Sequence, residues 1–127
     1  MNQIFNFMEF LKPLILNGTK TMTTRLETPF RLKCNVGDKM YLYTGLRTKN
    51  AEKFGEGKVI NRWRWNQRIL FNAVMIIENK MSPVGVTWNE FSRKEGFNDI
   101  SELITYFCNK RYKFKNLITY EFELKTK

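Results

Sequence analysis

The sequence predicts an α+β fold, in which a small mixed or antiparallel β-barrel is flanked by about three helices. The expected elements run in the order strand, helix, several strands, two helices and a final strand, which is not the alternation of a βαβ array. Strands dominate the middle of the chain, and the last strand must return to pair with earlier ones. A barrel meets both conditions without long exposed strand edges. At 127 residues the chain suits a single domain over residues 1–127, because two cores would each be too small.

The first quarter of the chain predicts a strand, a short helix and a second strand. Residues 4–7 suit a strand, and the apolar positions of residues 10–15 have helical spacing, with Pro13 tolerated in the first turn. Gly18 follows as a left-handed cap that ends this helix. Residues 20–26 are rich in threonine, which favours a strand.

The middle of the chain predicts three more strands. A turn at residues 35–38 precedes a strand over residues 39–44. Residues 45–57 contain several glycines and basic residues and are expected to form a loop. Two strands then follow over residues 58–65 and 69–77, joined by a tight polar connection.

The last third begins with two clear helix-start signals. Thr87 with Glu90, and Asp99 with Glu102, each have the spacing of a capping box. Gly96 separates the two predicted helices. Residues 117–124 alternate apolar and polar side chains, which predicts a half-buried strand that completes the sheet.

Charge is the strongest compositional signal. Lys and Arg number 22 against 12 Asp and Glu, a formal charge of +10. Such a surface attracts polyanions by displacing their counterions. The basic residues are spread along the chain, so a folded basic face is expected rather than a disordered arm. The expected partner is RNA, in single-stranded form, or a nucleotide or nucleoside.

The absence of histidine excludes several kinds of site. The chain has no His and two Cys, so histidine triads and histidine metal ligands are excluded. Cys34 and Cys108 stand apart in the sequence and are expected to be reduced thiols. No metal site and no cofactor are therefore predicted. Any acid–base chemistry must use Glu, Asp, Lys, Tyr or Cys.

Neither a membrane span nor a signal peptide is expected from the sequence. No apolar stretch approaches the roughly 20 residues that span a bilayer. The first ten residues contain Glu9 and no basic residue, unlike a signal peptide. No membrane partner is expected, and the default location is the cytoplasm, or the host cytoplasm for a viral source.

One segment resembles a known family signature. Residues 15–25 read ILNGTKTMTTR, which is similar to the ASCH pattern of Ile or Leu, two residues, Gly, any, Lys, Thr, any, Thr, any, Arg. Residues 36–38, 43–48 and 91–97 also fit, so the resemblance covers nearly the whole chain. It implies a PUA-like barrel with a cleft, between barrel and helices, for RNA or nucleotides. Some members of the family are amidohydrolases of acetylcytidine, and others are ribonucleases or RNA-binding regulators, so the resemblance defines fold better than reaction.

By similarity to the amidohydrolases, Lys20 would be the base, Thr23 the nucleophile and Glu95 the acid or base. A lysine acts as a base only where burial or nearby cations, such as Arg25, lower its pKa. Residues three apart face opposite sides of a regular strand, so Lys20 is expected on the loop before the strand. In a pure binding domain, Lys20 would instead contact a phosphate and Thr23 would pack as a strand residue. The residues leave both interpretations open.

Further basic and aromatic residues are candidates for binding RNA. Arg25 and Arg47 suit an anion clamp, because the guanidinium fork matches phosphate oxygens, and Lys49 extends the charge. The segment Arg62, Trp63, Arg64 and Trp65 is expected on a strand. Alternation would then place the two tryptophans on one face and the two arginines on the other. The tryptophans would stack bases while the arginines contact the backbone. The alternative is a barrel core with a charged exterior.

Four functions therefore remain from the sequence. The favoured one is an RNA- or nucleotide-binding domain with a basic cleft, which acts in RNA processing or regulation. The second is a hydrolase of acetylcytidine that uses Thr23, Lys20 and Glu95. The third is a metal-independent ribonuclease, and the fourth is a basic domain that binds other proteins.

Overall fold

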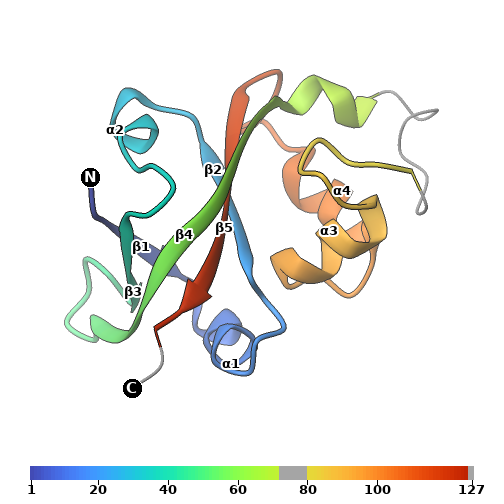
Figure 1. The fold of residues 1–127 in the computed structure, drawn as a ribbon. Helices are drawn as coiled ribbons and strands as arrows, with labels where there is room; N and C mark the ends of the chain where they lie inside the picture. The colour runs from blue at the N-terminus through green and yellow to red at the C-terminus, as the bar shows by residue number, and fades with distance from the viewer. Residues whose placement is uncertain (72–79, 126–127) are drawn as a thin grey trace.

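Five strands form one curled, mixed sheet with the order β1-β3-β4-β5-β2 (Figure 1). The computed structural model describes residues 1–71 and 80–125. β1 lies parallel to β3, and every other neighbouring pair is antiparallel. The strands are β1 (Gln3–Phe7), β2 (Met22–Leu26), β3 (Lys39–Thr44), β4 (Glu52–Asn66) and β5 (Asn116–Leu124). The sheet is a half-barrel with β1 and β2 at its edges, so the predicted α+β fold with a mixed, barrel-like sheet is confirmed.

Four α-helices surround the sheet in the described part of the chain, against about three expected. They are α1 (Lys12–Leu16), α2 (Pro29–Leu32), α3 (Trp88–Glu95) and α4 (Ile100–Phe107). In Figure 1, α3 and α4 lie together on one side of the sheet, and α1 lies near its lower end. α2 was not predicted from the sequence, although Thr28 caps it by accepting a hydrogen bond from the amide of Arg31 and Pro29 occupies its first position.

The predicted helix starts are confirmed. The Thr87 hydroxyl accepts a hydrogen bond from the Glu90 amide at 3.2 Å, and the Asp99 carboxylate accepts one from the Glu102 amide at 3.0 Å. These bonds satisfy amide donors that a helix terminus leaves without partners. Both helices therefore begin where their side chains supply an acceptor.

Two predictions in the middle of the chain are wrong. The expected loop over residues 45–57 is shorter, because β4 begins at Glu52. A Cβ at Gly57 would lie 3.2 Å from the carbonyl oxygen of Glu123, so this glycine allows close strand pairing instead of marking a loop. The expected strand over residues 69–77 begins inside a 3-10 helix, Gln67–Phe71, and its remainder lies outside the described residues.

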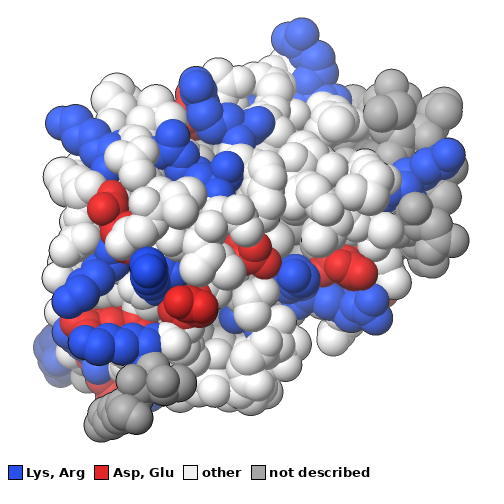
Figure 2. Space-filling view, viewed as in Figure 1, with Lys and Arg blue, Asp and Glu red and all other residues white. Residues whose placement is uncertain are grey.

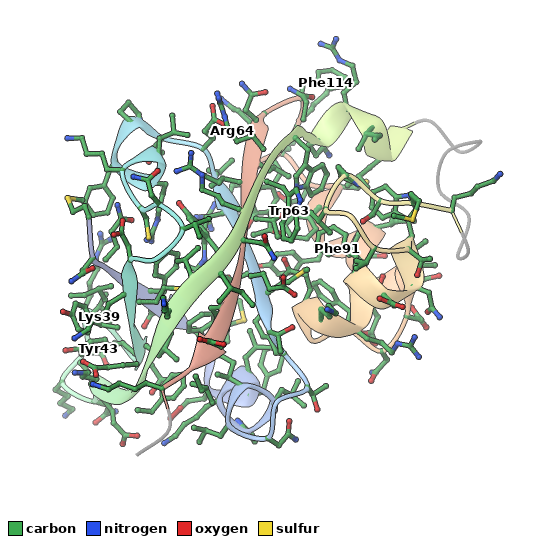
Figure 3. All side chains as sticks on the ribbon, in the orientation of Figure 1. Lys39, Tyr43, Trp63, Arg64, Phe91 and Phe114 are labelled. Carbon is green, nitrogen blue, oxygen red and sulfur yellow. The ribbon has the colours of Figure 1, made fainter. Side chains whose placement is uncertain are left out.

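Two apolar clusters fill the fold. The first lies in the curl of the sheet and includes Phe5, Leu42 and Tyr120. The second joins the sheet to α3 and α4, and here the ring of Trp65 meets Trp88, Phe91 and Phe107 edge to face. Figure 3 shows Trp63 and Phe91 between β4 and α3.

The two cysteines do not form a disulfide bond with each other. Cys34 is buried, Cys108 is exposed, and both are free thiols. Within residues 1–71 and 80–125, no helix is long and apolar enough to cross a membrane.

Candidate functional site

A cleft of about 1100 Å³ lies between the sheet edge and the helix pair. Residues at the end of β1, along β2, at the end of α3 and along α4 line it. Four predicted site residues meet there: Lys20, Thr23, Arg25 and Glu95. Ligand sites in proteins are commonly concave and of this size. The cleft is therefore the candidate functional site.

Lys20 lies at the inner wall of the cleft. It precedes β2, on the irregular segment where the sequence placed it, and only 3% of its surface is exposed. Its ammonium donates to the carbonyl oxygen of Met22 at 2.7 Å, and to the carbonyl and one carboxylate oxygen of Glu95 at 2.5 and 3.1 Å. An ammonium has three protons, and these three acceptors match them. Burial lowers the pKa of Lys20 below its ordinary value, although the Glu95 carboxylate opposes that shift.

Glu95 is the last residue of α3, and Gly96 follows it in a left-handed conformation with φ of 98°. A Cβ at Gly96 would lie 3.3 Å from Cδ of Lys20 and 3.3 Å from a methyl group of Leu11. Glycine is therefore needed here for two reasons, the backbone conformation and the passage of the lysine side chain. The end of α3 and the loop before β2 are joined through this close approach.

A chain of buried hydrogen bonds leads from Glu95 back into the core. The Thr24 hydroxyl donates to the second carboxylate oxygen of Glu95 and lies 2.7 Å from the Thr119 hydroxyl on β5. The Trp65 indole N–H donates to Thr119 at 2.9 Å. Because the carboxylate only accepts, Thr24 gives its single proton to Glu95 and must accept from Thr119, and Thr119 accepts from the Trp65 indole, so the whole chain is polarised toward Glu95.

Thr23 and Arg25 share one side of β2. The Arg25 Nε donates to the Thr23 hydroxyl at 3.1 Å, and its Nη2 donates to the carbonyl oxygen of Asn6 at 2.8 Å. The guanidinium lies over the ring of Phe7, 4.9 Å from its centre. Burial, and then the nearby positive charge of Arg31, lower the pKa of Arg25 to about 10. No ion pair among the described residues includes Arg25.

Arg31 is a further arginine of the cleft that was not predicted from the sequence. It donates to the Gln3 side chain and to the Ile4 carbonyl oxygen, both at 3.2 Å, and lies over the Phe5 ring. Burial lowers its pKa below the ordinary value. Arg25 and Arg31 thus both bond to β1, across the open edge of the half-barrel.

Cations and anions line the cleft in nearly equal numbers, but few of them are paired with each other. The lining cations are Lys20, Arg25, Arg31 and Arg111, and the lining anions are Glu95, Asp99 and Glu102. Glu95 is paired with Lys20, and the other two carboxylates accept backbone amides around the start of α4. The arginines are therefore the cations that this wall leaves for an anionic ligand.

Apolar and aromatic side chains also line the cleft. Phe7, Leu14 and Phe97 line the interior. Phe10 lines the cleft with 66% of its surface exposed, and Tyr106 is also exposed and packs its ring against Phe97. Exposed aromatic side chains beside a hollow are suited to stacking on a planar ligand.

The predicted catalytic trio is brought together only in part. Lys20 and Glu95 are hydrogen-bonded, and Thr23 lines the same cleft. None of the hydrogen bonds of Lys20 within the described residues goes to the Thr23 hydroxyl, which accepts from Arg25 instead. The threonine joined to the Lys20–Glu95 pair is Thr24.

Two predicted binding residues lie on the loop after β3. Neither Arg47 nor Lys49 lines the cleft. Arg47 adopts a left-handed conformation with φ of 71°, which is uncommon for a residue with a side chain. The structure therefore does not place either residue beside Lys20.

The segment of alternating Arg and Trp on β4 has structural partners. Trp65 is 7% exposed in the second apolar cluster, and Trp63 packs against that cluster. Arg62 donates to three oxygen atoms in and after α2. Arg64 forms a two-bond ion pair with Glu27, at 2.5 and 3.1 Å. None of the four residues lines the cleft, and their contacts fit the alternative of a core face with a charged exterior.

Comparison with known proteins supports the fold. No protein-family model matches the sequence, and no curated protein matches it. The hypothetical protein PH0355 has a similar structure, with a TM-score of 0.62 and 16% identity over 98% of this chain and 100% of that one. The ASCH domain from Lactobacillus crispatus has a TM-score of 0.58 and 14% identity, over 97% of this chain and 79% of that one. The S128A mutant of ZmASCH from Zymomonas mobilis has a TM-score of 0.58 and 12% identity, over 95% and 67%.

These likenesses show an ASCH-like fold. The resemblance noted in residues 15–25 and the overall architecture therefore agree.

Proposed function

We propose that the cleft binds a nucleotide, free or within RNA, with a phosphate at Arg25 and the base against the aromatic rim. The observation that carries this proposal is the arginine itself. Its guanidinium is half-buried, its pKa is lowered to about 10, and no ion pair of the described residues includes it. A partly buried charge outside any ion pair is incompletely compensated, and an incoming phosphate would supply a direct partner with bidentate geometry.

The aromatic rim supports the same ligand class. Phe10 and Tyr106 are exposed beside the cleft, and bases stack on such rings with a gain of about 1–3 kcal/mol each. Lys20, in contrast, is occupied by its own acceptors. In this proposal Lys20 positions the end of α3 through Glu95, while Arg25 contacts the ligand.

Calorimetric titration with cytidine 5′-monophosphate and with cytidine tests the proposal. We expect the nucleotide to bind at least about tenfold more tightly, because a charged hydrogen-bond pair contributes about 1.5–3 kcal/mol. Arg25→Gln should remove this preference, while Arg64→Gln, which changes a paired arginine outside the cleft, should retain it. Equal affinity of the unaltered protein for both compounds would contradict a phosphate site at Arg25.

A second candidate, hydrolysis of acetylcytidine, draws on the Lys20–Glu95 pair beside Thr23. The Thr23 oxygen would bond to the acetyl carbon, the amide C–N bond would break, the released amine would take a proton, and water would then free acetate. This reaction needs Lys20 or Glu95 to accept the hydroxyl proton of Thr23. Incubation with acetylcytidine, followed by detection of cytidine, tests it, and Thr23→Val should abolish any turnover that occurs. Turnover that survives this change would exclude Thr23 as the nucleophile.

A further inference from the structure

The turn between α4 and β5 gathers positive charge outside the deep part of the cleft. We name the basic turn by its residues: Lys110, Arg111, Lys113, Phe114 and Lys115, together with Arg68 of the facing 3-10 helix. All of these side chains are exposed. The sequence from residue 103 to residue 120 contains neither Asp nor Glu. No ion pair of the described residues includes a cation of the basic turn.

The basic turn lies at one end of the molecule. Figure 3 shows Phe114 at the turn that leads into β5, at the opposite end of the sheet from Lys39. In Figure 2, most of the acidic side chains in view lie in the lower half, away from that end. Uncompensated charge of one sign produces a local potential that attracts anions.

Phe114 stands at the centre of this charge in a strained conformation. Its φ is 55° and 48% of its surface is exposed. A left-handed backbone costs a bulky residue on the order of 1–3 kcal/mol and persists only where neighbours impose it. The Phe114 amide donates to the side chain of Gln67 at 2.9 Å, and its carbonyl oxygen accepts from Asn66 at 3.1 Å. Gln67 is fully buried and is held by a bond to the Phe107 carbonyl at 2.8 Å.

These contacts hold an aromatic ring at the surface close to two cations. The guanidinium of Arg68 lies 5.3 Å and the ammonium of Lys113 lies 5.6 Å from the centre of the Phe114 ring. Proteins bind single strands with this combination, since aromatic rings stack on bases while cations follow the phosphates. An acidic protein surface would use the cations but would not require the ring.

The basic turn is continuous with the cleft. Arg111 and Tyr112 line the cleft, and Lys113 and Phe114 follow directly in the chain. A strand with one nucleotide in the cleft would therefore leave it past Arg111. We infer that the basic turn binds the neighbouring nucleotides of the same single strand, an inference that rests on the proposed function. The preferred ligand is then an oligonucleotide and not a free nucleoside.

This inference is tested by comparing two affinities. One is that of a labelled oligocytidylate of ten nucleotides, measured by fluorescence anisotropy, and the other is that of cytidine 5′-monophosphate, measured by calorimetry. We expect the oligonucleotide to bind at least about tenfold more tightly than the mononucleotide. The double change Arg68→Gln with Lys113→Gln should weaken oligonucleotide binding about tenfold or more. It should reduce the slope of log affinity against log salt by about 1.4, because each phosphate contact on a single strand contributes about 0.7. Mononucleotide binding should not change.

A matched double change controls for the loss of net charge. Lys39→Gln with Lys58→Gln removes two exposed lysines that face each other in the β3–β4 register, at the other end of the sheet. This variant should keep nearly all of the oligonucleotide affinity. A third variant, Phe114→Ala, should weaken the oligonucleotide and spare the mononucleotide.

Several outcomes would overturn the inference. If both double variants lose affinity equally, the binding is non-specific charge attraction. If the mononucleotide binds but the oligonucleotide binds no more tightly, the cleft proposal stands and the basic turn has no part. If neither ligand binds, the proposed function itself fails. If polyglutamate or vesicles that contain phosphatidylserine bind as tightly as the oligonucleotide, and with the same response to the variants, the partner class is wrong.

Discussion

Arg25 and Arg64 both lie on strands, yet they differ in burial and in ion pairing. Arg64 is exposed on β4 and forms a two-bond ion pair with Glu27. Arg25 is half-buried on β2, and its hydrogen bonds go to a hydroxyl and a backbone carbonyl, which carry no net charge. The more buried cation is thus the one that lacks a carboxylate. The two residues carry the same charge and differ in whether an ion pair includes them.

Lys20 differs from both arginines, because it is more deeply buried than Arg25 and is paired like Arg64. Its counter-ion, Glu95, comes from another element and is itself held by Thr24. A buried cation with a complete set of internal acceptors depends on those acceptors, because removal of one partner leaves an uncompensated charge, and a half-buried cation outside any ion pair is available to a ligand. Three substitutions test this distinction, in order of expected effect.

Glu95→Ala should produce the largest loss, because it leaves Lys20 buried without its carboxylate. Breaking a buried ion pair from one side costs about 3–5 kcal/mol. The free energy of unfolding, measured by urea denaturation, should fall by about that amount. The double change Lys20→Met with Glu95→Leu should lose less than Glu95→Ala alone, because it removes both charges together.

Glu90→Ala is the matched control on the same helix. Glu90 is exposed in the first turn of α3, and no ion pair of the described residues includes it. Its replacement should cost less than about 1 kcal/mol. Equal losses for the Glu90 and Glu95 variants would show that Lys20 does not depend on its counter-ion.

Thr24→Val should have the next largest effect. It removes the hydroxyl that donates to Glu95 and breaks the chain that begins at Trp65. A buried acceptor that loses its donor costs about 1–3 kcal/mol. Thr23→Val is the isosteric control, since its hydroxyl bonds to Arg25 and lies outside that chain. Thr24→Val should therefore destabilise the protein more, and the reverse order would contradict the polarised chain.

The fold was largely predictable because its signals are local. Thr87 and Asp99 start helices by bonding amides three residues away, and a strand such as β3 needs only alternation. The start of β4 was missed because Gly57 has its reason on another strand, in close contact with Glu123. A glycine that permits strand pairing and a glycine that forms a turn look alike in sequence.

The candidate site was predictable only where a motif carried it. Lys20, Thr23, Arg25 and Glu95 meet in one cleft, as the resemblance implied. Thr24 was missed because alternation assigns it to the side of the strand opposite Thr23, and its link to Glu95 depends on how α3 docks. Arg31 was missed because it lies on α2 and bonds to Ile4 of β1, and these two elements become neighbours only in the folded protein.

The final test of the comparison is Arg64→Gln, for which we expect the smallest effect. An exposed ion pair contributes little because solvent screens it, so the free energy of unfolding at pH 7 should fall only slightly. The hydrogen bond from Arg64 lowers the pKa of Glu27 below its ordinary value of 4.5. A carboxylate whose pKa is depressed in the folded state adds stability above its unfolded pKa and loses it as the pH falls through the folded value. The difference between the unaltered protein and Arg64→Gln should therefore be constant above about pH 5.5 and vanish at acid pH, as urea denaturation across that range would show. A difference that persists after Glu27 is protonated would mean that Arg64 stabilises the fold by packing. The ion pair with Glu27 would then not be what distinguishes Arg64 from Arg25.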